Sequence, residues 1–279
     1  MSREQTRIVP INTGWIEGDL GTYLFWKGEA GKKIWMPVIC FYIDTGEHKI
    51  MVDTGMSTAE RASEFHHKAE QRDGKDAPDA LKAMGVDPDE IDIVIMTHLH
   101  WDHCQNIKKF RNARLICSAA EIQWAYNPLP LYYRSYESPI LGIEPPFYGC
   151  QFELVEGVVT IADGVSVFPT PGHSVGHMSV QVETTAGACV IAGDAIFRLR
   201  NLEPNEKERW RYWVPARFVN SIDGWKSVEE LDRRGDVILA CHDDATLEHP
   251  EYPYPGMPLR KRREPMPGLP FFTGEQSRA

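Results

Sequence analysis

The chain has 279 residues, of which 42% are hydrophobic and 25% are charged, and its formal net charge at pH 7 is −10. This length and apolar content are enough for one large hydrophobic core, while the acidic balance makes nucleic acid and anionic lipid poor partners because both carry negative charge. No apolar run approaches the ~20 residues that cross a bilayer, and the N-terminus has no apolar segment like that of a secretory signal.

In the first third of the chain, two strand signals come first and two helix signals follow them. The two strand signals, at 37–44 and 49–53, flank a polar turn at Thr45-Gly46-Glu47, which is typical of a hairpin. The second helix has Asp76 as its cap, Pro78 in its first turn and Gly85 just past its end. Four elements are therefore expected here: strands at 37–44 and 49–53, and helices at 57–72 and 76–84.

The middle of the chain begins with a continuous apolar run over 91–98, which suits a strand buried on both faces. A short strand is expected at 113–117, and Ser118 with Glu121 forms a capping-box pattern that opens a helix. Residues 126–149 hold six aromatic residues and five prolines, so they cannot form a long helix and are interpreted as an ordered insertion loop.

The second half repeats the same theme. Five strand candidates lie between 152 and 194, a helix is expected over 223–234, and another buried strand over 236–241. Strands in both halves, each group followed by helices, fit two packed sheets with helices outside, although strand counting alone does not separate this from other α/β folds. We expect a single domain over 1–255 and an irregular C-terminal tail over 256–279.

Four side chains able to bind metals lie close together directly after the apolar run 91–98. They are His98, His100, Asp102 and His103. Residues two apart on a strand point the same way, so His98 and His100 can share one ion, and a following turn lets Asp102 and His103 reach another direction. A chance cluster of surface histidines would not explain the buried strand before them.

Three more candidate ligands each follow a strand candidate. They are His173, Asp194 and His242. Seven ligands are too many for one ion with an open site, but they suffice for two ions with one bridging carboxylate. Imidazole and carboxylate donors suit zinc as well as iron, manganese or cobalt.

The pattern His98-x-His100-x-Asp102-His103, followed by His173 in TPGHSVGH, Asp194 in GDA and His242, resembles the full ligand set of the metallo-β-lactamase superfamily. The resemblance runs from about residue 38 to 243 and includes Asp53 in VDTG. It implies a four-layer αββα sandwich of two mixed β-sheets with outer helices. It also implies one metal on His98, His100 and His173, a second on Asp102, His103 and His242, and Asp194 bridging them.

Within the superfamily, HLHWDHCQN together with TPGHSVGH resembles the N-acyl homoserine lactonases, which are quorum-quenching enzymes. The expected activity is that of a metal-dependent carboxylic-ester hydrolase, in which a metal-bridging hydroxide opens a lactone and Asp102 relays the proton. The alternatives are hydrolysis of another small ester, thioester, amide or phosphotriester, and a catalytically silent metal-binding module. One residue departs from the lactonase pattern: Phe197 stands where those enzymes carry Tyr, so either another residue such as Tyr212 supplies the hydrogen bond or the substrate differs.

Aromatic residues on loops near the ligands predict a pocket for a small molecule with an apolar or aromatic part. The insertion loop could instead cover the core or form a subunit interface, as in a homodimer. The expected substrate-contacting residues are Phe197, Trp210, Tyr212, Trp213, Tyr133 and Phe147.

Other polar residues have simpler interpretations. His177 is expected to support the site rather than to coordinate a metal. His66, His67 and His249 lie in polar stretches and are interpreted as solvated surface. Asp53 could hydrogen-bond a ligand histidine or cap the turn after its strand.

Six scattered cysteines without a C-x-x-C pair indicate reduced thiols, which predicts a cytoplasmic protein.

Overall fold

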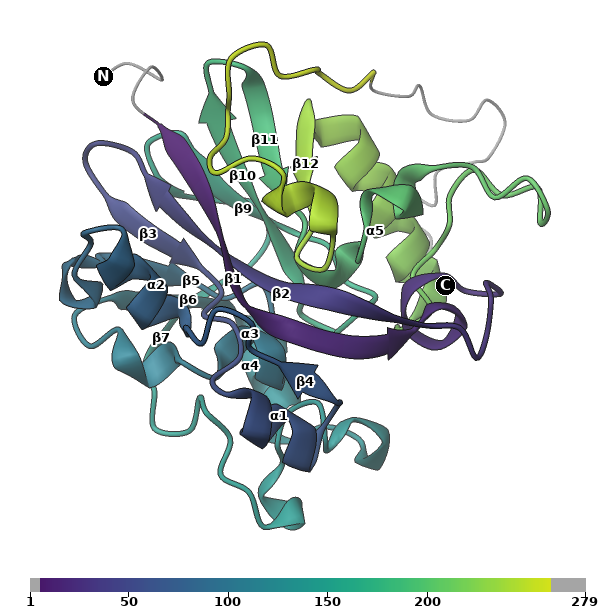
Figure 1. The fold of residues 1–279 in the computed structure, drawn as a ribbon, viewed down its shortest axis with the longest axis horizontal. Coiled ribbons are helices and arrows are strands. Elements are labelled where there is room, and N and C mark those ends of the chain that lie inside the picture. Colours follow the sequence, from purple (N-terminus) through teal and green to yellow (C-terminus); the bar gives the residue numbers. More distant parts are fainter. Residues whose placement is uncertain (1–5, 262–279) are drawn as a thin grey trace, which may run out of the picture.

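The computed structural model describes residues 6–261 and places two mixed β-sheets face to face, with helices on both outer sides (Figure 1). The first sheet has the strand order β4-β1-β2-β3-β5-β6-β7 and the second has the order β12-β11-β10-β9-β8. The strands of the first sheet are β1 (Arg7–Asp19), β2 (Lys33–Asp44), β3 (Lys49–Val52), β4 (Ala69–Glu70), β5 (Ile93–Ile95), β6 (Arg114–Ser118) and β7 (Phe152–Val155). Those of the second are β8 (Val159–Ala162), β9 (Val165–Pro169), β10 (Met178–Thr184), β11 (Gly187–Ile191) and β12 (Val237–Leu239).

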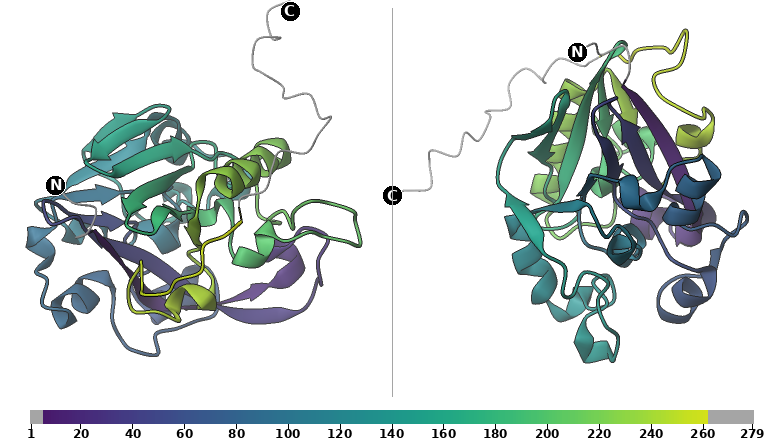
Figure 2. Two further views of the ribbon diagram at one scale, coloured as in Figure 1. Left: turned by 90° about the horizontal axis from the view of Figure 1, so that it is seen from above. Right: turned by 90° about the vertical axis from the view of Figure 1, so that its left-hand side faces the viewer.

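In the described part of the chain, five α-helices cover the outer faces of the two sheets. They are α1 (Ala59–Phe65), α2 (Ala77–Ala83), α3 (Trp101–Cys104), α4 (Ala119–Tyr126) and α5 (Ser221–Arg234). Figure 2 shows α5 on the side of the second sheet and the four shorter helices on the side of the first. The chain therefore has the four-layer αββα arrangement that the resemblance implied.

The alternation of side chains along β2 shows how the sequence builds these layers. Ile39, Phe41 and Ile43 point into the core between the two sheets, while Cys40 and Tyr42 point to the other face, where α2 and α4 pack. Successive residues of a strand point to opposite faces, so a run that is apolar at every position must be covered on both sides.

A third cluster lies under α5, where Val228 and Leu231 pack against Val190 of β11. Serine, aspartate and charged residues occupy much of the rest of this helix, as expected for a helix with one covered face.

Several expected elements are confirmed. The hairpin of β2 and β3 is antiparallel, Asp76 caps α2 by accepting a hydrogen bond from Asp79 N, and α5 begins two residues before its expected start. The segment expected to be an ordered loop over 126–149 begins at the last residue of α4, and residues 127–149 are irregular apart from two short 3₁₀ turns at Pro130–Tyr132 and Pro139–Leu141.

Other expectations are wrong. The helix expected over 57–72 stops at Phe65, and Ala69–Glu70 instead pairs with β1. The strand expected over 91–98 is only Ile93–Ile95, so His98 and His100 lie on a loop rather than on a strand. The long strand β1 was not expected.

Strand direction places the two ligand-bearing regions at one edge of the sandwich. β3 and β5 are parallel in the first sheet, and β11 and β12 are parallel in the second. β9 runs in the same direction as β11, because both are antiparallel to β10. The segments after β5, β9, β11 and β12 therefore meet at this edge.

Within residues 6–261, no helix is long and apolar enough to cross a membrane. The C-terminal segment turns back onto the first sheet, where Tyr252 exchanges two backbone hydrogen bonds with Ile8 of β1. Most of the irregular tail expected over 256–279 lies outside the described residues.

Candidate metal centre

All seven expected ligands converge at the edge where the sheets meet. His98 and His100 lie on the loop after β5, and Asp102 and His103 lie in α3. The others follow β9, β11 and β12: His173, Asp194 and His242. All seven are buried or nearly so.

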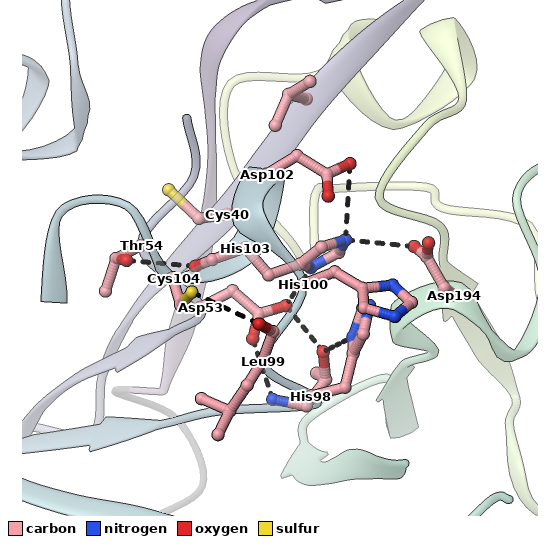
Figure 3. Close-up of polar contacts among 12 residues, drawn as sticks. Cys40, Asp53, Thr54, His98, Leu99, His100, Asp102, His103, Cys104 and Asp194 are labelled. Carbon is pink, nitrogen blue, oxygen red and sulfur yellow. Dashed lines mark hydrogen bonds and ion pairs between the residues drawn. The ribbon is translucent and has the colours of Figure 1, made fainter. Parts of the chain in front are cut away.

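The ligand atoms form two groups. His98, His100 and His173 offer atoms that lie within 4.8 Å of one another, and so do Asp102, His103 and His242. Asp194 lies between the groups. One of its carboxylate oxygens is 3.3 Å from His173 Nε2, and the other is 3.3 Å from His103 Nε2 and 3.2 Å from His242 Nε2. Figure 3 shows His103 and His98 turned toward the same space as Asp194.

The donor set fits divalent cations. Five buried atoms in this cluster have no hydrogen-bond partner within residues 6–261: Nε2 of His98, His100, His103 and His242, and Oδ1 of Asp194. Leaving buried polar atoms unpaired costs about 1–3 kcal/mol each, and a cation coordinated by these nitrogen and oxygen donors would remove that cost.

Hydrogen bonds to the opposite ring nitrogens orient three of these histidines. His103 Nδ1 lies 2.8 Å from Asp53 Oδ2, and His242 Nδ1 lies 2.7 Å from the carbonyl oxygen of Pro37. His173 Nδ1 lies 3.2 Å from the carbonyl oxygen of Arg217. Each bond turns Nε2 toward the centre of the cluster, as is usual for metal-binding histidines.

Asp53 also anchors the start of the ligand loop. It accepts hydrogen bonds from the backbone N–H and the hydroxyl of Thr97, both over 2.8 Å. Its backbone has φ of 60°, a left-handed conformation that is uncommon outside glycine. The expectation that Asp53 hydrogen-bonds a ligand histidine is confirmed.

His177 supports the site in the way the sequence predicted. Its Nε2 accepts a hydrogen bond from Asp194 N over 2.9 Å, and its Nδ1 lies 2.9 Å from the hydroxyl of Thr170. The acceptor role of Nε2 fixes the neutral tautomer with its proton on Nδ1. Burial, together with the charge of His173, lowers the pKa of His177 to about 3.

Glu121 was expected to cap its own helix, and this is wrong. No side-chain bond caps α4, and the carboxylate points inward, fully buried. One oxygen accepts hydrogen bonds from Leu99 N and the Tyr136 hydroxyl, and the other from the Ser174 hydroxyl and Gly176 N. Glu121 thus ties the loop of His98 and His100 to the loop of His173. No sequence signal distinguishes this role from capping.

The charge states suit coordination at one group of ligands. Burial and the neighbouring histidines hold the pKa values of His98 and His100 well below the ordinary value, so these rings are neutral, as metal binding requires. Although burial alone would lower the pKa values of His103 and His242 and raise that of Asp194, the attraction between these rings and the Asp194 carboxylate raises the former and lowers the latter. A cation bound at the second group would therefore displace protons from His103 and His242.

Cys104 and Cys241, which neighbour two of the candidate ligands, are fully buried, and burial raises the pKa of both thiols well above the ordinary value. They are packed neighbours of the ligands.

A cavity of about 410 Å³ opens over the cluster. Candidate ligands Asp102, Asp194, His100, His173 and His242 form part of its wall. The rest of the wall is half apolar and half polar. The apolar residues are Ile16, Met36, Trp101, Pro130, Leu131, Leu141 and Phe197, and the polar ones are Tyr23, His66, His67, Tyr133, Arg134, Ser135 and Arg217.

The structure brings two of the six expected substrate residues to this cavity. Phe197 lies between His173 and His242, with ring centroids 5.6 and 5.3 Å away, and Tyr133 also lines the wall. Phe147, Trp210, Tyr212 and Trp213 are not part of that wall. The suggestion that Tyr212 supplies a hydrogen bond to substrate is corrected, because its buried hydroxyl donates to Asp232 over 2.9 Å.

The expectation that His66 and His67 are solvated surface is also wrong. The His66 ring stacks on Trp101 with centroids 4.1 Å apart, and its Nε2 lies 2.8 Å from Glu137 Oε1. His67 packs edge-on against Tyr23 at 5.1 Å. Both line the cavity, whereas His249 lies away from it, stacked on Tyr254.

Comparison with known proteins matches residues 34–242 to the family model described as the metallo-beta-lactamase superfamily. The chain is similar to an N-acyl homoserine lactonase of Bacillus thuringiensis, with 30% identity over 223 residues that cover 76% of this chain and 84% of that protein. It is also similar to the N-acyl homoserine lactonase AttM of Rhizobium johnstonii, with 30% identity over 64% of this chain and 69% of the relative. A solved N-acyl homoserine lactone hydrolase with the product N-hexanoyl-L-homoserine at its metal centre superposes with a TM-score of 0.70 and 24% identity, covering 88% of this chain and 96% of that one.

Proposed function

The chain belongs to the metallo-beta-lactamase superfamily, and from that membership we propose that it is a metal-dependent hydrolase that opens the ester of a lactone of the N-acyl homoserine lactone kind. The observation that carries this proposal is the convergence of seven candidate ligands into one cluster, five of which line the cavity. Five buried ligand atoms of this cluster have no hydrogen-bond partner among the described residues. The lactonases to which it is similar support the substrate class.

Two divalent cations would be held by these residues. His98, His100 and His173 would hold one, and Asp102, His103 and His242 the other, with Asp194 facing both. We propose zinc, because it accepts nitrogen and oxygen donors readily, although iron, manganese and cobalt accept the same set. When bound, such a pair supplies Lewis acidity and a source of hydroxide at neutral pH.

Asp102 is the side chain proposed to move the proton. It lies on the cavity wall, and its Oδ2 is 3.6 Å from His242 Nε2 and 3.8 Å from His103 Nε2. From this position its carboxylate can take the proton of the attacking water and return it to the leaving oxygen of the opened ring.

Apolar residues of the wall are proposed to hold the acyl part of the substrate. Phe197, Met36 and Leu141 offer an apolar surface beside the ligand cluster and exclude water from it.

Metal analysis combined with a proton-release assay on lactones, thioesters and aryl esters tests the proposal. We expect two metal ions per chain and one proton released for each lactone opened. His103→Ala should lower the metal content and abolish turnover, while His249→Ala, outside the cavity, serves as the matched control. An unchanged rate for His103→Ala would contradict the assignment.

Hydrolysis of another small ester, a thioester, an amide or a phosphotriester is the second candidate, and Phe197 favours it. A phenyl ring cannot donate a hydrogen bond to a lactone carbonyl, and Tyr212 is directed elsewhere. Two bound metals with turnover only on the other substrates of the panel would select this candidate.

We further propose a cytoplasmic location, since all six cysteines are free thiols and five of them are buried. A homodimer stays a prediction that light scattering would test.

A further inference from the structure

Two arginines line the cavity, and neither has a carboxylate partner among residues 6–261: Arg134 and Arg217. Other arginines near the site are ion-paired. Arg61 binds Glu137 over 2.6 Å, and Arg198 binds Asp244 over 3.3 Å. Unpaired cations in the cavity wall need an explanation in a chain with 40 acidic and 30 basic residues.

Arg217 lies immediately beside the ligand cluster. Its carbonyl oxygen lies 3.2 Å from His173 Nδ1, and its charge contributes to the low pKa values of His100 and His173. Its Nη2 donates to the Ser135 hydroxyl over 2.8 Å, and its guanidinium stands 5.3 Å from the ring centroid of Tyr132. The remaining donors, Nε and Nη1, have no partner in the described part of the chain.

Arg134 contributes a second positive charge from the insertion loop, which also carries Ser135 and Tyr132. It donates one hydrogen bond, from Nη1 to the carbonyl oxygen of Phe65 over 2.7 Å. Its side chain is exposed, so its charge is screened more by water than that of the half-buried Arg217.

The acidic residues of the cavity wall cannot balance these charges once metals are bound. The wall contains only two carboxylates in the described chain, Asp102 and Asp194, and both belong to the candidate ligand set. Two divalent cations more than offset them. The loaded cavity therefore has a positive potential that attracts an anion.

We propose that the substrate carries a carboxylate in the part that projects from the reacting ester, and that Arg217 binds this carboxylate with Arg134 beside it. The inference rests on the proposed function, because it places the ester at the metal cluster. Nη2 has a second N–H beside the one that donates to Ser135, and together with Nε or Nη1 it offers two neighbouring donors that match a carboxylate, which makes Arg217 a specificity-determining residue.

The competing explanation is that Arg217 only braces the insertion loop. The Ser135 and Tyr132 contacts would do this whether or not a ligand binds. If Arg217 only braces the loop, its replacement should lower kcat/KM equally for every substrate. If Arg217 binds the carboxylate, its replacement should lower kcat/KM only for the substrate that carries one.

A matched pair of substrates separates these explanations. The pair is N-adipoyl-L-homoserine lactone, with a free terminal carboxylate, and its neutral methyl ester. In the zinc-loaded enzyme we expect kcat/KM for the acid to exceed that for the methyl ester by about tenfold or more, as one charge-assisted contact allows. The preference should shrink as salt is added.

Arg217→Met should remove this preference, Arg217→Lys should retain part of it, and Arg134→Met should reduce it less. Lys82→Met removes a positive charge from the exposed face of α2, outside the cavity, and should leave the ratio unchanged. Equal kcat/KM values for the two substrates in the parent enzyme, or equal losses on both in Arg217→Met, would overturn the proposal.

Equilibrium binding keeps this test separate from the proposed activity. The opened products of both substrates can be titrated calorimetrically into the zinc-loaded protein, and both carry the same homoserine carboxylate for the metals. Tighter binding of the adipoyl product that is lost in Arg217→Met would support the anion site, whether or not either lactone is turned over. Absence of turnover on both lactones would refute only the lactonase activity. Equal binding of the two products would refute the anion site.

Discussion

The carboxylate of Glu121 accepts a hydrogen bond from the Ser174 hydroxyl over 2.6 Å, which joins helix α4 to the loop that presents His173. The other carboxylate oxygen holds Leu99 between the two ligands His98 and His100. One buried side chain therefore fixes two ligand loops that lie far apart in the sequence.

Replacing this carboxylate should weaken both the fold and the site. Glu121→Gln leaves one pair of buried donors facing an amide N–H₂ group, so we expect a loss of about 2–4 kcal/mol in the free energy of unfolding. Urea unfolding of the metal-free protein measures it. Glu156→Gln, at an exposed position, should change the value by less than about 0.5 kcal/mol. Equal stability of the two variants would show that the buried network contributes nothing.

Asp53→Asn should loosen the second group of ligands. Asparagine tolerates the left-handed backbone at this position, but its single oxygen cannot serve both Thr97 and His103. We expect metal affinity to fall by about 10–100-fold, as for other partners of ligand histidines. Metal retained after dialysis against a graded chelator series measures the change, with Asp73→Asn as the exposed control. Retention equal to that of the parent protein would refute the orienting role.

His177 should stay neutral at pH values where an ordinary histidine is protonated. Its folded pKa of about 3 lies below the ordinary value of 6.5, so the unfolded chain binds one more proton between these values. Its contribution to stability is therefore complete above about pH 6.5 and is lost as the pH falls toward 3, with a slope of up to about 1.4 kcal/mol per pH unit.

Nitrogen chemical shifts of labelled histidines at pH 5 test this directly, with His177→Gln used to assign the signals. The expected pattern is a neutral ring protonated at Nδ1. An imidazolium signal for His177 at pH 5 would be incompatible with the hydrogen bond from Asp194 N.

Phe197→Tyr should improve lactone opening. The Phe197 ring is buried beside His173 and His242 on the cavity wall, where a tyrosine hydroxyl would donate a hydrogen bond to a substrate oxygen. One such bond made in the transition state is worth about tenfold in kcat/KM. Rates with N-hexanoyl homoserine lactone measure the effect, and Phe218→Tyr, outside the cavity wall, is the control. A slower Phe197→Tyr enzyme would indicate that the phenyl ring itself contacts the substrate.

The candidate ligands could be found from the sequence because their spacing is local and their chemistry is narrow. Four of them fall within six residues, and the three distant ones follow apolar strands whose ends meet at one edge of the sandwich. Strand alternation was nevertheless the wrong reason for pairing His98 with His100, since the strand ends at Ile95 and the loop brings them together.

The residues of the cavity wall could not be predicted from the sequence in the same way. His66 and His67 follow a polar helix, and only the distant partners Trp101, Glu137 and Tyr23 turn them inward. The spacing of Glu121 fits a capping box. Its carboxylate instead accepts four hydrogen bonds from other segments, which stabilise it more than a capping bond would.

The strand β1 was missed for a local reason. Pro10 and two glycines interrupt its apolar pattern, and proline cannot donate to a ladder. Pairing with the whole length of β2, through an irregularity between Asn12 and Gly14, holds it in the sheet despite these residues.

The division of the ligands between the two sheets has a practical consequence. An exposed turn at Gly157 and Val158 separates β7 from β8. A backbone cut there would leave four ligands on one fragment and three on the other. Neither fragment could assemble a metal-binding cluster alone, so the two fragments should associate more tightly when zinc is added. The extent of their reassociation would then report the zinc concentration.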